Sequence, residues 1–371
     1  MVNKLKVIIS GGGTGGHIFP AIAIANAIKK IKPDAEILFV GAQGRMEMEK
    51  VPKAGYPIEG LWISGFQRKL TTQNLLFPLK LLSSLAKARR ILRRFQPDVA
   101  IGVGGYASGP TLQMANQMGI PALIQEQNSY AGATNRLLAQ RVEKICVAYD
   151  KMERYFPKGK LIQTGNPVRS DLINVTASKA EAAANFKLDV TKKTIVLFGG
   201  SLGAKTLNEA MAASTEWLQQ RPDVQILWQC GSLYVDEYQN SETSKLPNVK
   251  ISAFIDRMDL AYLLADVVVC RAGALTISEL CLVGKPAILI PSPNVAEDHQ
   301  TKNAMALVEK DAAILLKNAD AKVKMIPAAL QLLDDDNFVK QKLAINIQKL
   351  AKPNAAEEIA KEVLNLVRGE K

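Results

Sequence analysis

A glycine-rich loop near the start of the chain is the first feature with chemical potential. Gly11-Gly12-Gly13-Thr14-Gly15-Gly16-His17 follows the apolar run Val7-Ile8-Ile9. Glycines let a strand turn sharply into a helix, and the exposed amides and positive end of that helix favour a phosphate. A purely structural turn is the alternative. His17 is then either a hydrogen-bonding structural residue or a general base, which contributes roughly 10²–10⁴-fold when well placed.

Two common nucleotide-binding patterns do not fit this loop. A dinucleotide-binding fold needs an acid about 20 residues further on, at the end of the second strand. Glu36 has about that spacing but opens the strand, which ends in Phe39-Val40-Gly41-Ala42. No Gly-Lys-Ser/Thr follows the glycines, so the loop is not an ATP-binding P-loop. The sequence therefore predicts another phosphate-bearing ligand.

Further small or polar loops follow other predicted strands. In the first half these are Gly102-Val103-Gly104-Gly105-Tyr106 and Gln125-Glu126-Gln127-Asn128. In the second half Gly199-Gly200-Ser201 and Arg271-Ala272-Gly273-Ala274 each open a helix. Ligands of open α/β sheets bind at the carboxyl ends of the strands, so these loops predict two binding edges. For Glu279, helix capping is the alternative to binding the two hydroxyls of a ribose.

The elements that position these loops alternate between short apolar strands and helical stretches. Most strand candidates are rich in Val and Ile without alternation, as strands buried on both faces are. The plan occurs twice and predicts an α/β protein with two Rossmann-like domains, joined near Gly165-Asn166-Pro167. The predicted strands span residues 6–10, 37–40, 99–103, 122–125, 144–147, 194–198, 225–229, 249–252, 267–270 and 287–290.

The last segment predicts a helix that packs on a core. Asn354 is a good N-cap, and Glu357 lies three residues further on, the spacing of a capping box. The apolar residues at helical spacing are Ile359, Val363, Leu366 and Val367.

Composition is that of an ordinary soluble protein. The 371 residues are 48% hydrophobic and 22% charged, which fits two or three domains. No apolar run approaches the roughly 18 residues of a transmembrane helix, and the run at 7–9 is too short for a signal peptide. Four scattered cysteines and only two histidines favour free thiols in the cytoplasm over a zinc site.

Five motifs together resemble the MurG family of bacterial N-acetylglucosaminyltransferases, in glycosyltransferase family 28. They are Gly-Gly-Thr-Gly-Gly-His at 12–17, Gln-Glu-Gln-Asn at 125–128, Gly-Asn-Pro-Val-Arg at 165–169, Phe-Gly-Gly-Ser-Leu-Gly-Ala at 198–204 and Cys-Arg-Ala-Gly-Ala-Leu-Thr-Ile-Ser-Glu at 270–279. The resemblance spans the chain. It implies a GT-B fold, two Rossmann-like domains with parallel sheets facing across a cleft. Residues 1–168 would serve the acceptor and the membrane, residues 169–350 would bind UDP-N-acetylglucosamine, and a helix in 351–371 would pack back on the first domain.

The resemblance also implies a reaction. N-acetylglucosamine is transferred from UDP-N-acetylglucosamine to the 4-hydroxyl of the N-acetylmuramoyl-pentapeptide of lipid I, which is linked to undecaprenyl pyrophosphate. The product is lipid II, for peptidoglycan synthesis. We expect an inverting single displacement without metal or other cofactor. The only formal match to an Asp-x-Asp site for a divalent ion is Asp334-Asp335-Asp336, which does not end a strand and is therefore expected to be a solvated turn. A diacylglycerol glycosyltransferase and a UDP-N-acetylglucosamine 2-epimerase are the alternatives.

The resemblance assigns residues to the ligands. The donor would be bound by Thr14, Gly15, Gly16, Asn128, Arg169, Ser201, Ile255, Ala274, Leu275, Thr276, Ile277, Ser278, Glu279 and Gln300. In this set Arg169 and Ile255 hold the uracil side, Ser201 and the turn 274–276 the diphosphate, Glu279 the ribose and Gln300 the sugar hydroxyls. His299 departs from the family pattern. The acceptor diphosphate is expected at Gly13, Gly104, Gly105 and Tyr106. His17 is the preferred base, and Glu126 is the second candidate.

The net charge of +12 is concentrated in one segment. From Gly60 to Pro97 there is no acid, and the cations are Arg68, Lys69, Lys80, Lys87, Arg89, Arg90, Arg93 and Arg94. Leu75, Leu79, Leu82 and Leu85 fall near helical spacing in the same segment. A helix packed on its own core is the alternative to an interfacial membrane patch, in which each cation adds about 1 kcal/mol on anionic lipid.

We favour the membrane patch, because a polyprenyl-linked acceptor requires docking. It would comprise Leu76, Phe77, Lys80, Leu82, Lys87, Arg89, Arg90 and Arg93. The expected partners are the two substrates, the anionic cytoplasmic face of the inner membrane and other cell-wall enzymes. Nucleic acid is not expected despite a pI near 9.4, because the segment lacks interleaved aromatics.

Overall fold

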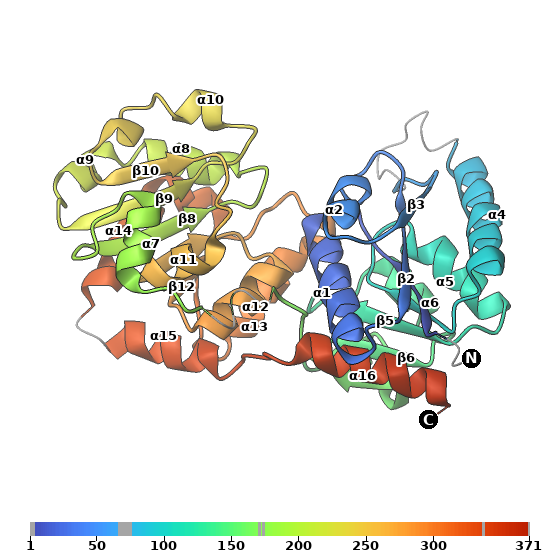
Figure 1. The fold of residues 1–371 in the computed structure, drawn as a ribbon. Helices are drawn as coiled ribbons and strands as arrows, with labels where there is room; N and C mark the ends of the chain where they lie inside the picture. Colours follow the sequence, from blue (N-terminus) through green and yellow to red (C-terminus); the bar gives the residue numbers. More distant parts are fainter. Residues whose placement is uncertain (1–3, 66–75, 170–171, 173–174, 336–337, 370–371) are drawn as a thin grey trace. The chain divides into compact units, whose positions relative to one another are not determined.

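The computed structural model describes residues 4–65, 76–169, 172, 175–335 and 338–369. The chain divides into two compact units. Unit 1 comprises Met1–Arg169 and Lys352–Lys371, and unit 2 comprises Ser170–Ala351. Each unit is a Rossmann-like domain built on one parallel sheet with helices on its faces (Figure 1). The sequence puts the first boundary between residues 168 and 169, one residue away.

Unit 1 contains a seven-stranded sheet in the order β3-β2-β1-β4-β5-β6-β7. Its strands are β1 (Lys6–Ser10), β2 (Glu36–Ala42), β3 (Ile58–Leu61), β4 (Val99–Gly102), β5 (Ala122–Glu126), β6 (Lys144–Val147) and β7 (Leu161–Gln163). All neighbouring pairs are parallel, and the register pairs Ser10 with Gly102. The loops after β1 and β4 therefore begin side by side at the same edge of the sheet.

Helices cover both faces of this sheet. They are α1 (Gly15–Ile31), α2 (Glu47–Lys53), α4 (Phe77–Phe95), α5 (Ser108–Gln117), α6 (Ala133–Leu138) and α16 (Ala355–Arg368). Side chains alternate along a strand. Val7 and Ile9 accordingly pack with α1 and α16, while Ile8 packs with α4 and α5 on the other face. Burial on both faces is the reason why β1 reads as a continuous apolar run.

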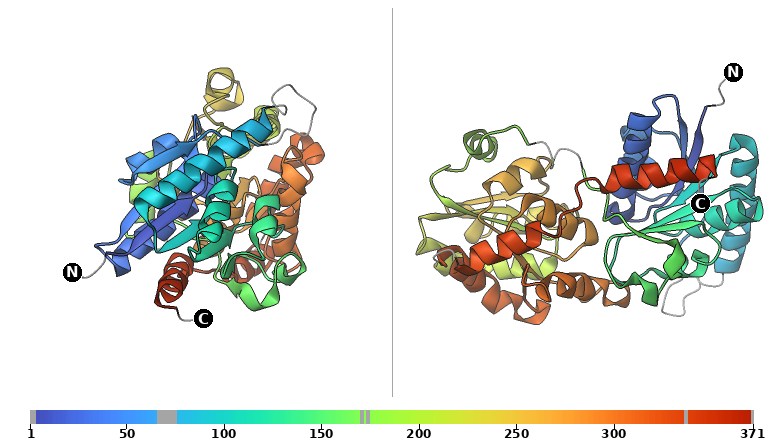
Figure 2. Two further views of the ribbon diagram at one scale, coloured as in Figure 1. Left: turned by 90° about the vertical axis from the view of Figure 1, so that its right-hand side faces the viewer. Right: turned by 90° about the horizontal axis from the view of Figure 1, so that it is seen from below.

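The helix α16 completes the core of unit 1. Ile359, Ala360 and Val363 are fully buried in the cluster that α1 forms on the sheet. α16 packs against α1, and the views of Figures 1 and 2 both show it running along this unit. Asn354 is the N-cap as the sequence predicts, but its side chain makes no capping bond, and Glu357 instead pairs with Lys30 of α1 at 2.6 Å.

Unit 2 contains a six-stranded parallel sheet in the order β10-β9-β8-β11-β12-β13. Its strands are β8 (Lys193–Phe198), β9 (Val224–Gln229), β10 (Val249–Ser252), β11 (Val267–Cys270), β12 (Ala287–Leu289) and β13 (Ile314–Leu315). Its α-helices are α7 (Lys179–Phe186), α8 (Lys205–Ala212), α9 (Thr215–Gln219), α10 (Val235–Tyr238), α11 (Met258–Leu264), α12 (Ala274–Val283), α13 (His299–Val308), α14 (Ala321–Asp334) and α15 (Phe338–Gln348). The register pairs Phe198 with Cys270, so the loops after β8 and β11 also begin side by side.

The α/β prediction with two parallel sheets is confirmed. Every strand predicted from the sequence is present, with bounds within about two residues of those expected. The strands that the sequence did not predict are β3, β7 and β13, each of which is short and lies at the edge of its sheet. β3 contains Glu59 and Gly60 and β7 has only two apolar residues, so neither shows a continuous apolar run, whereas β13 lies in an apolar run but is only two residues long. Of the helices in the described ranges, none is both long and apolar enough to cross a lipid bilayer.

Candidate functional site

The loop between β1 and α1 carries the first group of candidate residues. Gly13 has φ +86°, a left-handed conformation that favours glycine. Thr14 then returns to an extended conformation as the N-cap of α1. The helix begins at Gly15, so Gly15, Gly16 and His17 form its first turn. Here the sequence prediction of a tight strand-to-helix turn is confirmed.

The loop after β4 packs directly on this first loop. Gly105 has φ +87°, and a Cβ there would overlap the carbonyl oxygen of Gly12. A Cβ at Gly104 would lie 2.9 Å from Nε2 of His17. Two glycines thus bring the second loop against the first, with the imidazole of His17 beside Gly104. Tyr106, expected at the same site, is 47% exposed.

The imidazole of His17 is oriented by its own loop. Nδ1 lies 3.1 Å from the carbonyl oxygen of Gly12 and 3.3 Å from Oγ1 of Thr14. A carbonyl can only accept a hydrogen bond, so the contact with Gly12 requires the proton on Nδ1. In that tautomer Nε2 is the basic nitrogen. His17 is half-buried.

Glu126, at the end of β5, is only 1% exposed. Its carboxylate accepts hydrogen bonds from the backbone N–H of Asn128 at 3.0 Å, from that of Gly132 at 3.0 Å and from Nδ2 of Asn135 at 2.8 Å. Burial raises the pKa of Glu126, and these bonds partly offset the rise. The carboxylate therefore organises the loop that carries Asn128, which also donates to it from Nδ2 at 3.3 Å.

Two buried glutamines connect the end of β5 to neighbouring segments. Nε2 of Gln127 donates to the carbonyl of Val103, in the loop after β4, at 2.8 Å. Nε2 of Gln125 donates to Oδ1 of Asn166 at 2.9 Å. Nδ2 of Asn166 in turn donates to the carbonyl of Gln127 at 3.0 Å. The polar run 125–128 thus fixes the segment that leads to the half-buried Arg169.

Glu47 is a residue of this site that sequence reasoning missed. It is the first residue of α2 and is 1% exposed. Its carboxylate accepts the N–H of Gly13 at 2.8 Å and the N–H of Ala42 at 2.9 Å. The N–H of Gly13, expected to face a phosphate, therefore donates its hydrogen bond to a side chain of the protein itself. A dinucleotide-binding pattern places its acid at the end of the second strand, whereas Glu47 lies in the helix just beyond that strand.

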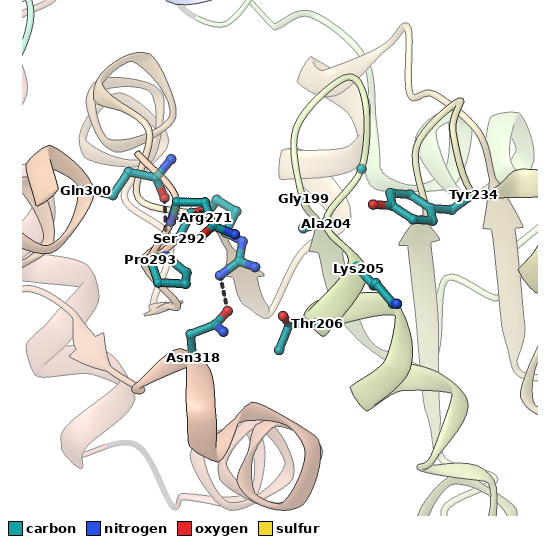
Figure 3. Close-up of a pocket in the computed structure, with 12 residues that line it drawn as sticks. Gly199, Ala204, Lys205, Thr206, Tyr234, Arg271, Ser292, Pro293, Gln300 and Asn318 are labelled. Carbon is teal, nitrogen blue, oxygen red and sulfur yellow. Dashed lines mark hydrogen bonds between the residues drawn. The ribbon is translucent and has the colours of Figure 1, made fainter. Parts of the chain in front are cut away.

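In unit 2 the loop after β8 borders a pocket of about 320 Å³ (Figure 3). This volume is at the lower end of the range for small-molecule sites. The pocket lies at the carboxyl ends of β8, β11 and β12. Its lining residues are Gly199, Gly203, Ala204, Lys205, Thr206, Tyr234, Arg271, Ser292, Pro293, Asn294, Gln300 and Asn318.

Arg271 and Gln300 organise one wall of this pocket. Nη1 of Arg271 donates to the carbonyls of Ile290 at 2.9 Å and Pro291 at 3.1 Å and to Oδ1 of Asn318 at 2.7 Å. Burial lowers the pKa of Arg271 to about 10. Oε1 of Gln300 accepts the N–H of Ser292 at 2.8 Å, and both side chains appear in Figure 3. A cation and an amide, both held in place, face a volume suited to a polar ligand.

Other donor residues expected from the sequence also lie in unit 2. Ser201 is exposed in the loop between the lining residues Gly199 and Gly203. The expected turn 274–278 is the first part of α12, which follows β11 and Arg271. Ile255 is 2% exposed and lies between β10 and α11. Glu279, in α12, accepts a hydrogen bond from the hydroxyl of Tyr262 at 3.0 Å.

Several lining residues of the pocket were not singled out from the sequence. Lys205 and Thr206 begin α8 directly after the glycine loop, a position that signals an anion site. Arg271 lies in the motif at 270–279, but the resemblance assigns it no role. Tyr234 and Asn318 lie in segments without any motif, and only the fold brings them to the pocket.

The basic segment forms the helix α4 from Phe77 onward. The apolar side chains of Leu76, Leu79 and Leu82 are 45%, 59% and 64% exposed. Arg89, Arg90 and Arg93 are exposed further along the same helix. Trp62, outside the expected patch, is 46% exposed, and Nζ of Lys80 lies 5.8 Å from the centre of its ring. An exposed apolar end followed by an exposed arginine cluster characterises this helix.

Two of the expected patch lysines contact the protein instead of projecting freely. Nζ of Lys80 donates to Oγ of Ser64 at 3.0 Å, and Nζ of Lys87 donates to the carbonyl of Gly60 at 2.7 Å. Phe77 is half-buried and packs on the core. Arg68, Lys69 and Leu75 lie outside the described residues.

The acidic run at 334–336 begins at the end of α14. Asp334 bonds to Nη1 of Arg221 at 2.6 Å, and Asp335 accepts the N–H groups of Val339 and Lys340. Asp336 lies outside the described residues. Within the part of the chain that the structure describes, no cluster of three or more His, Cys, Asp or Glu side chains has the arrangement of a metal site.

Comparisons with known proteins match the whole chain. The glycosyltransferase family 28 N-terminal domain matches residues 7–147, and the corresponding C-terminal domain matches residues 194–362. A protein of Bacteroides fragilis is 55% identical over 99% of this chain and 97% of its own length. One of Flavobacterium psychrophilum is 54% identical over the full length of both. Both are named UDP-N-acetylglucosamine--N-acetylmuramyl-(pentapeptide) pyrophosphoryl-undecaprenol N-acetylglucosamine transferase.

Solved structures share the fold. The crystal structure of Acinetobacter baumannii MurG is similar with a TM-score of 0.75 at 28% identity, covering 97% of this chain and 99% of that one. A UDP-N-acetylglucosamine 2-epimerase from Neisseria meningitidis is similar with a TM-score of 0.69 at 16% identity, covering 98% of this chain and all of that one. The second likeness concerns the fold alone. Together with the two parallel sheets, these likenesses establish the GT-B fold.

Proposed function

We propose that this chain, which belongs to glycosyltransferase family 28, transfers N-acetylglucosamine from UDP-N-acetylglucosamine to lipid I. The acceptor is the N-acetylmuramoyl-pentapeptide linked to undecaprenyl pyrophosphate, and the product is lipid II of peptidoglycan synthesis. The observation that carries this proposal is the 55% identity over 99% of the chain to a transferase of that name.

A test of the proposal is release of UDP from UDP-N-acetylglucosamine by the purified chain. UDP should appear only when a lipid I analogue is present, together with a disaccharide product. Formation of the 2-epimer of the donor sugar without any acceptor would favour the epimerase reading. Release of UDP with diacylglycerol as the acceptor would favour the lipid glycosyltransferase reading.

His17 is the general base of the proposed reaction. Its Nε2 takes the proton of the acceptor's 4-hydroxyl while that oxygen attacks the anomeric carbon and UDP leaves on the opposite side, with inversion. The tautomer required by the contact with Gly12 supports this role. Glu126, the second candidate, is buried and accepts bonds from its own loop, which suits it to holding Asn128 in place.

The donor is held by unit 2 in this proposal. The diphosphate binds at Ser201 and the amino-terminal turn of α12, residues 274–278, while Glu279 takes the ribose and Ile255 the uracil side. Gln300 binds the sugar hydroxyls from the wall of the pocket, and Lys205 and Arg271 add positive charge there. The family resemblance assigns Arg169 to the uracil side as well, and Thr14, Gly15, Gly16 and Asn128 to the sugar.

The leaving group needs no metal ion in this proposal. Helix amino termini and nearby cations stabilise the charge that develops on UDP. α8 begins at Lys205 directly after the glycine loop, and α12 begins three residues after Arg271. EDTA should therefore leave the turnover of the purified chain unchanged. Loss of turnover with EDTA and recovery with Mg²⁺ would contradict this part of the proposal.

The acceptor is bound by unit 1. Gly104 lies beside the proposed base and Gly105 packs on Gly12, and with Tyr106 of the same loop they form the proposed site for the acceptor diphosphate. Gly13 contributes the turn of the first loop, while its N–H is donated to Glu47.

Docking on an anionic membrane surface is proposed for the helix α4, at the cytoplasmic face of the cell membrane. The exposed leucines would enter the interface, and the exposed arginines would contact lipid head groups. Charge reversal by Arg89→Glu and Arg93→Glu should weaken cosedimentation with anionic vesicles by at least about fivefold per residue, because each lost cation alone is worth about 1 kcal/mol. Lys361→Glu, an exposed position of α16, is the matched control. Binding insensitive to salt and to these reversals would contradict the proposal.

A further inference from the structure

A buried carboxylate that the proposed reaction does not use lies beneath the loop that carries His17. Glu47 is 1% exposed. Its Oε2 accepts the N–H of Gly13 at 2.8 Å, and its Oε1 accepts the N–H of Ala42, the last residue of β2, at 2.9 Å. Burying a carboxylate is costly unless it is hydrogen-bonded, so these two amides are what keeps it at this position.

The glycines around Glu47 leave space for its side chain. A Cβ at Gly12 would lie 2.8 Å from Oε2, and one at Gly41 would lie 2.5 Å from Cγ. Neither is a distance that real Cβ atoms adopt. Glycine at these two positions therefore lets the carboxylate reach the underside of the loop.

One peptide group connects Glu47 to His17. The N–H of the Gly12–Gly13 peptide belongs to Gly13 and donates to Glu47. The carbonyl of the same peptide belongs to Gly12 and lies 3.1 Å from Nδ1 of His17. Hydrogen bonds in series polarise one another, so a carboxylate on the N–H strengthens the carbonyl as an acceptor. The bond also prevents this peptide plane from turning its carbonyl away from the imidazole.

We propose that Glu47 is a positioning residue that holds His17, through the Gly12–Gly13 peptide, in the tautomer with the proton on Nδ1. The inference rests on the proposed role of His17 as the base. In the transfer step Nε2 accepts the proton of the attacking hydroxyl as the new C–O bond forms and the bond to UDP breaks. Glu47 neither touches the substrates nor takes the proton; it fixes which nitrogen is available.

A simple structural brace is the competing explanation for Glu47. The carboxylate joins the end of β2 to the loop after β1, which would stabilise unit 1 whatever the state of the imidazole. The two explanations differ in one observable. A brace predicts no change in the tautomer of His17 in a folded variant, whereas the proposal requires one.

The experiment measures this tautomer directly in the full chain. The sequence has only two histidines, His17 and His299, so ¹⁵N labelling of the imidazoles gives two ring systems, which the variant His299→Gln assigns. The wild-type chain, at a pH where the ring is neutral, should show the Nδ1–H tautomer of His17. Glu47→Gln should reduce that population. It should also lower kcat by about 10- to 100-fold, with KM for UDP-N-acetylglucosamine changed by less than about twofold.

Glu143→Gln is the matched control. Glu143 also accepts a backbone N–H in unit 1, that of Ala122 at 2.6 Å, but at the opposite end of the strands from the glycine loops. This variant should leave the tautomer of His17 unchanged. A folded Glu47→Gln with the wild-type tautomer would overturn the proposal.

A second variant covers the case in which Glu47→Gln does not fold. Glu47→Asp keeps the charge but withdraws the carboxylate from Gly13 by one methylene, so a partial loss of the Nδ1–H form is expected, and an unchanged tautomer would again overturn the proposal. The readout does not depend on turnover. A chain that shows the predicted shift but transfers no sugar would contradict only the proposed function.

Discussion

The two units open with the same arrangement of strand, glycine loop and helix, yet the two loops have different neighbours. The loop after β1 contacts a carboxylate of the protein itself, since Glu47 accepts the N–H of Gly13. The loop after β8 borders a pocket of about 320 Å³ that Lys205 and Arg271 help to line. A loop with an internal anion is suited to orienting a side chain, whereas a loop beside an open, cationic pocket is suited to an anionic ligand. The same backbone motif thus serves two purposes.

The largest test of this comparison is removal of the imidazole from the first loop. His17→Ala should lower kcat by about two to four orders of magnitude, because the reaction loses its base. Donor affinity, measured by titration calorimetry with UDP-N-acetylglucosamine, should change little, because the donor is proposed to bind mainly to unit 2. A loss of only a few-fold in kcat would assign the base to another residue. A large loss of donor affinity would contradict the proposal that the donor binds mainly to unit 2.

A second test concerns the shape of the loop after β8. Gly203→Ala places a Cβ onto the carbonyl of Cys230 at φ +87°, while Gly200→Ala has a similar φ of +94° and open space. Gly200→Ala should cost about 1–2 kcal/mol of unfolding free energy from the backbone alone. Gly203→Ala should cost about 1–3 kcal/mol more from the overlap. Urea unfolding of both variants measures the difference, and equal losses would show that the close approach is unimportant.

A third test measures what the pocket contributes to donor binding. Gln300→Ala removes one neutral hydrogen-bonding group and should weaken UDP-N-acetylglucosamine binding by about 3- to 10-fold. Gln239→Ala, an exposed position of the same unit, is the control. Binding of UDP alone should be unaffected by either variant, because Gln300 is assigned to the sugar. Equal weakening for UDP and for the nucleotide sugar would contradict this assignment.

The smallest expected effect concerns the pH dependence of stability, because the pKa values of one acid in each unit shift in opposite directions. Hydrogen bonds from Arg221 hold the pKa of Asp334 below its usual range, whereas burial raises that of Glu126 in unit 1. A lowered carboxyl pKa stabilises the folded chain at pH values above the unfolded pKa of about 4, and this contribution disappears as the pH falls through the folded pKa. Asp334→Asn should cost less than about 1 kcal/mol at pH 7, since Asp334 is 47% exposed, and nothing near pH 2. A cost independent of pH would point to packing instead.

The sequence predicted the central strands and the glycine loops because their signals are local. A buried parallel strand is a continuous apolar run, and a strand-to-helix turn needs glycines at fixed places. The edge strands β3 and β7 lack such runs and were missed. β13 lies in the apolar run 312–316 but pairs over only two residues, and it was missed as well. Glu47 and Asn318 were missed for another reason. Each acts through contacts with residues distant in sequence, Gly13 for Glu47 and Arg271 for Asn318, so no local pattern identifies it.

The return of α16 to unit 1 has a consequence for the order of events during synthesis. Ile359, Ala360 and Val363 complete a core that begins with Val7 and Ile9. A ribosome makes all of unit 2 before it makes these residues. The core of unit 1 therefore remains incomplete, with an apolar face of α1 uncovered, until unit 2 has been synthesised. Nascent chains that stall before residue 355 should need a holding chaperone at that face, and the unit that is translated first should be the last to reach its final form.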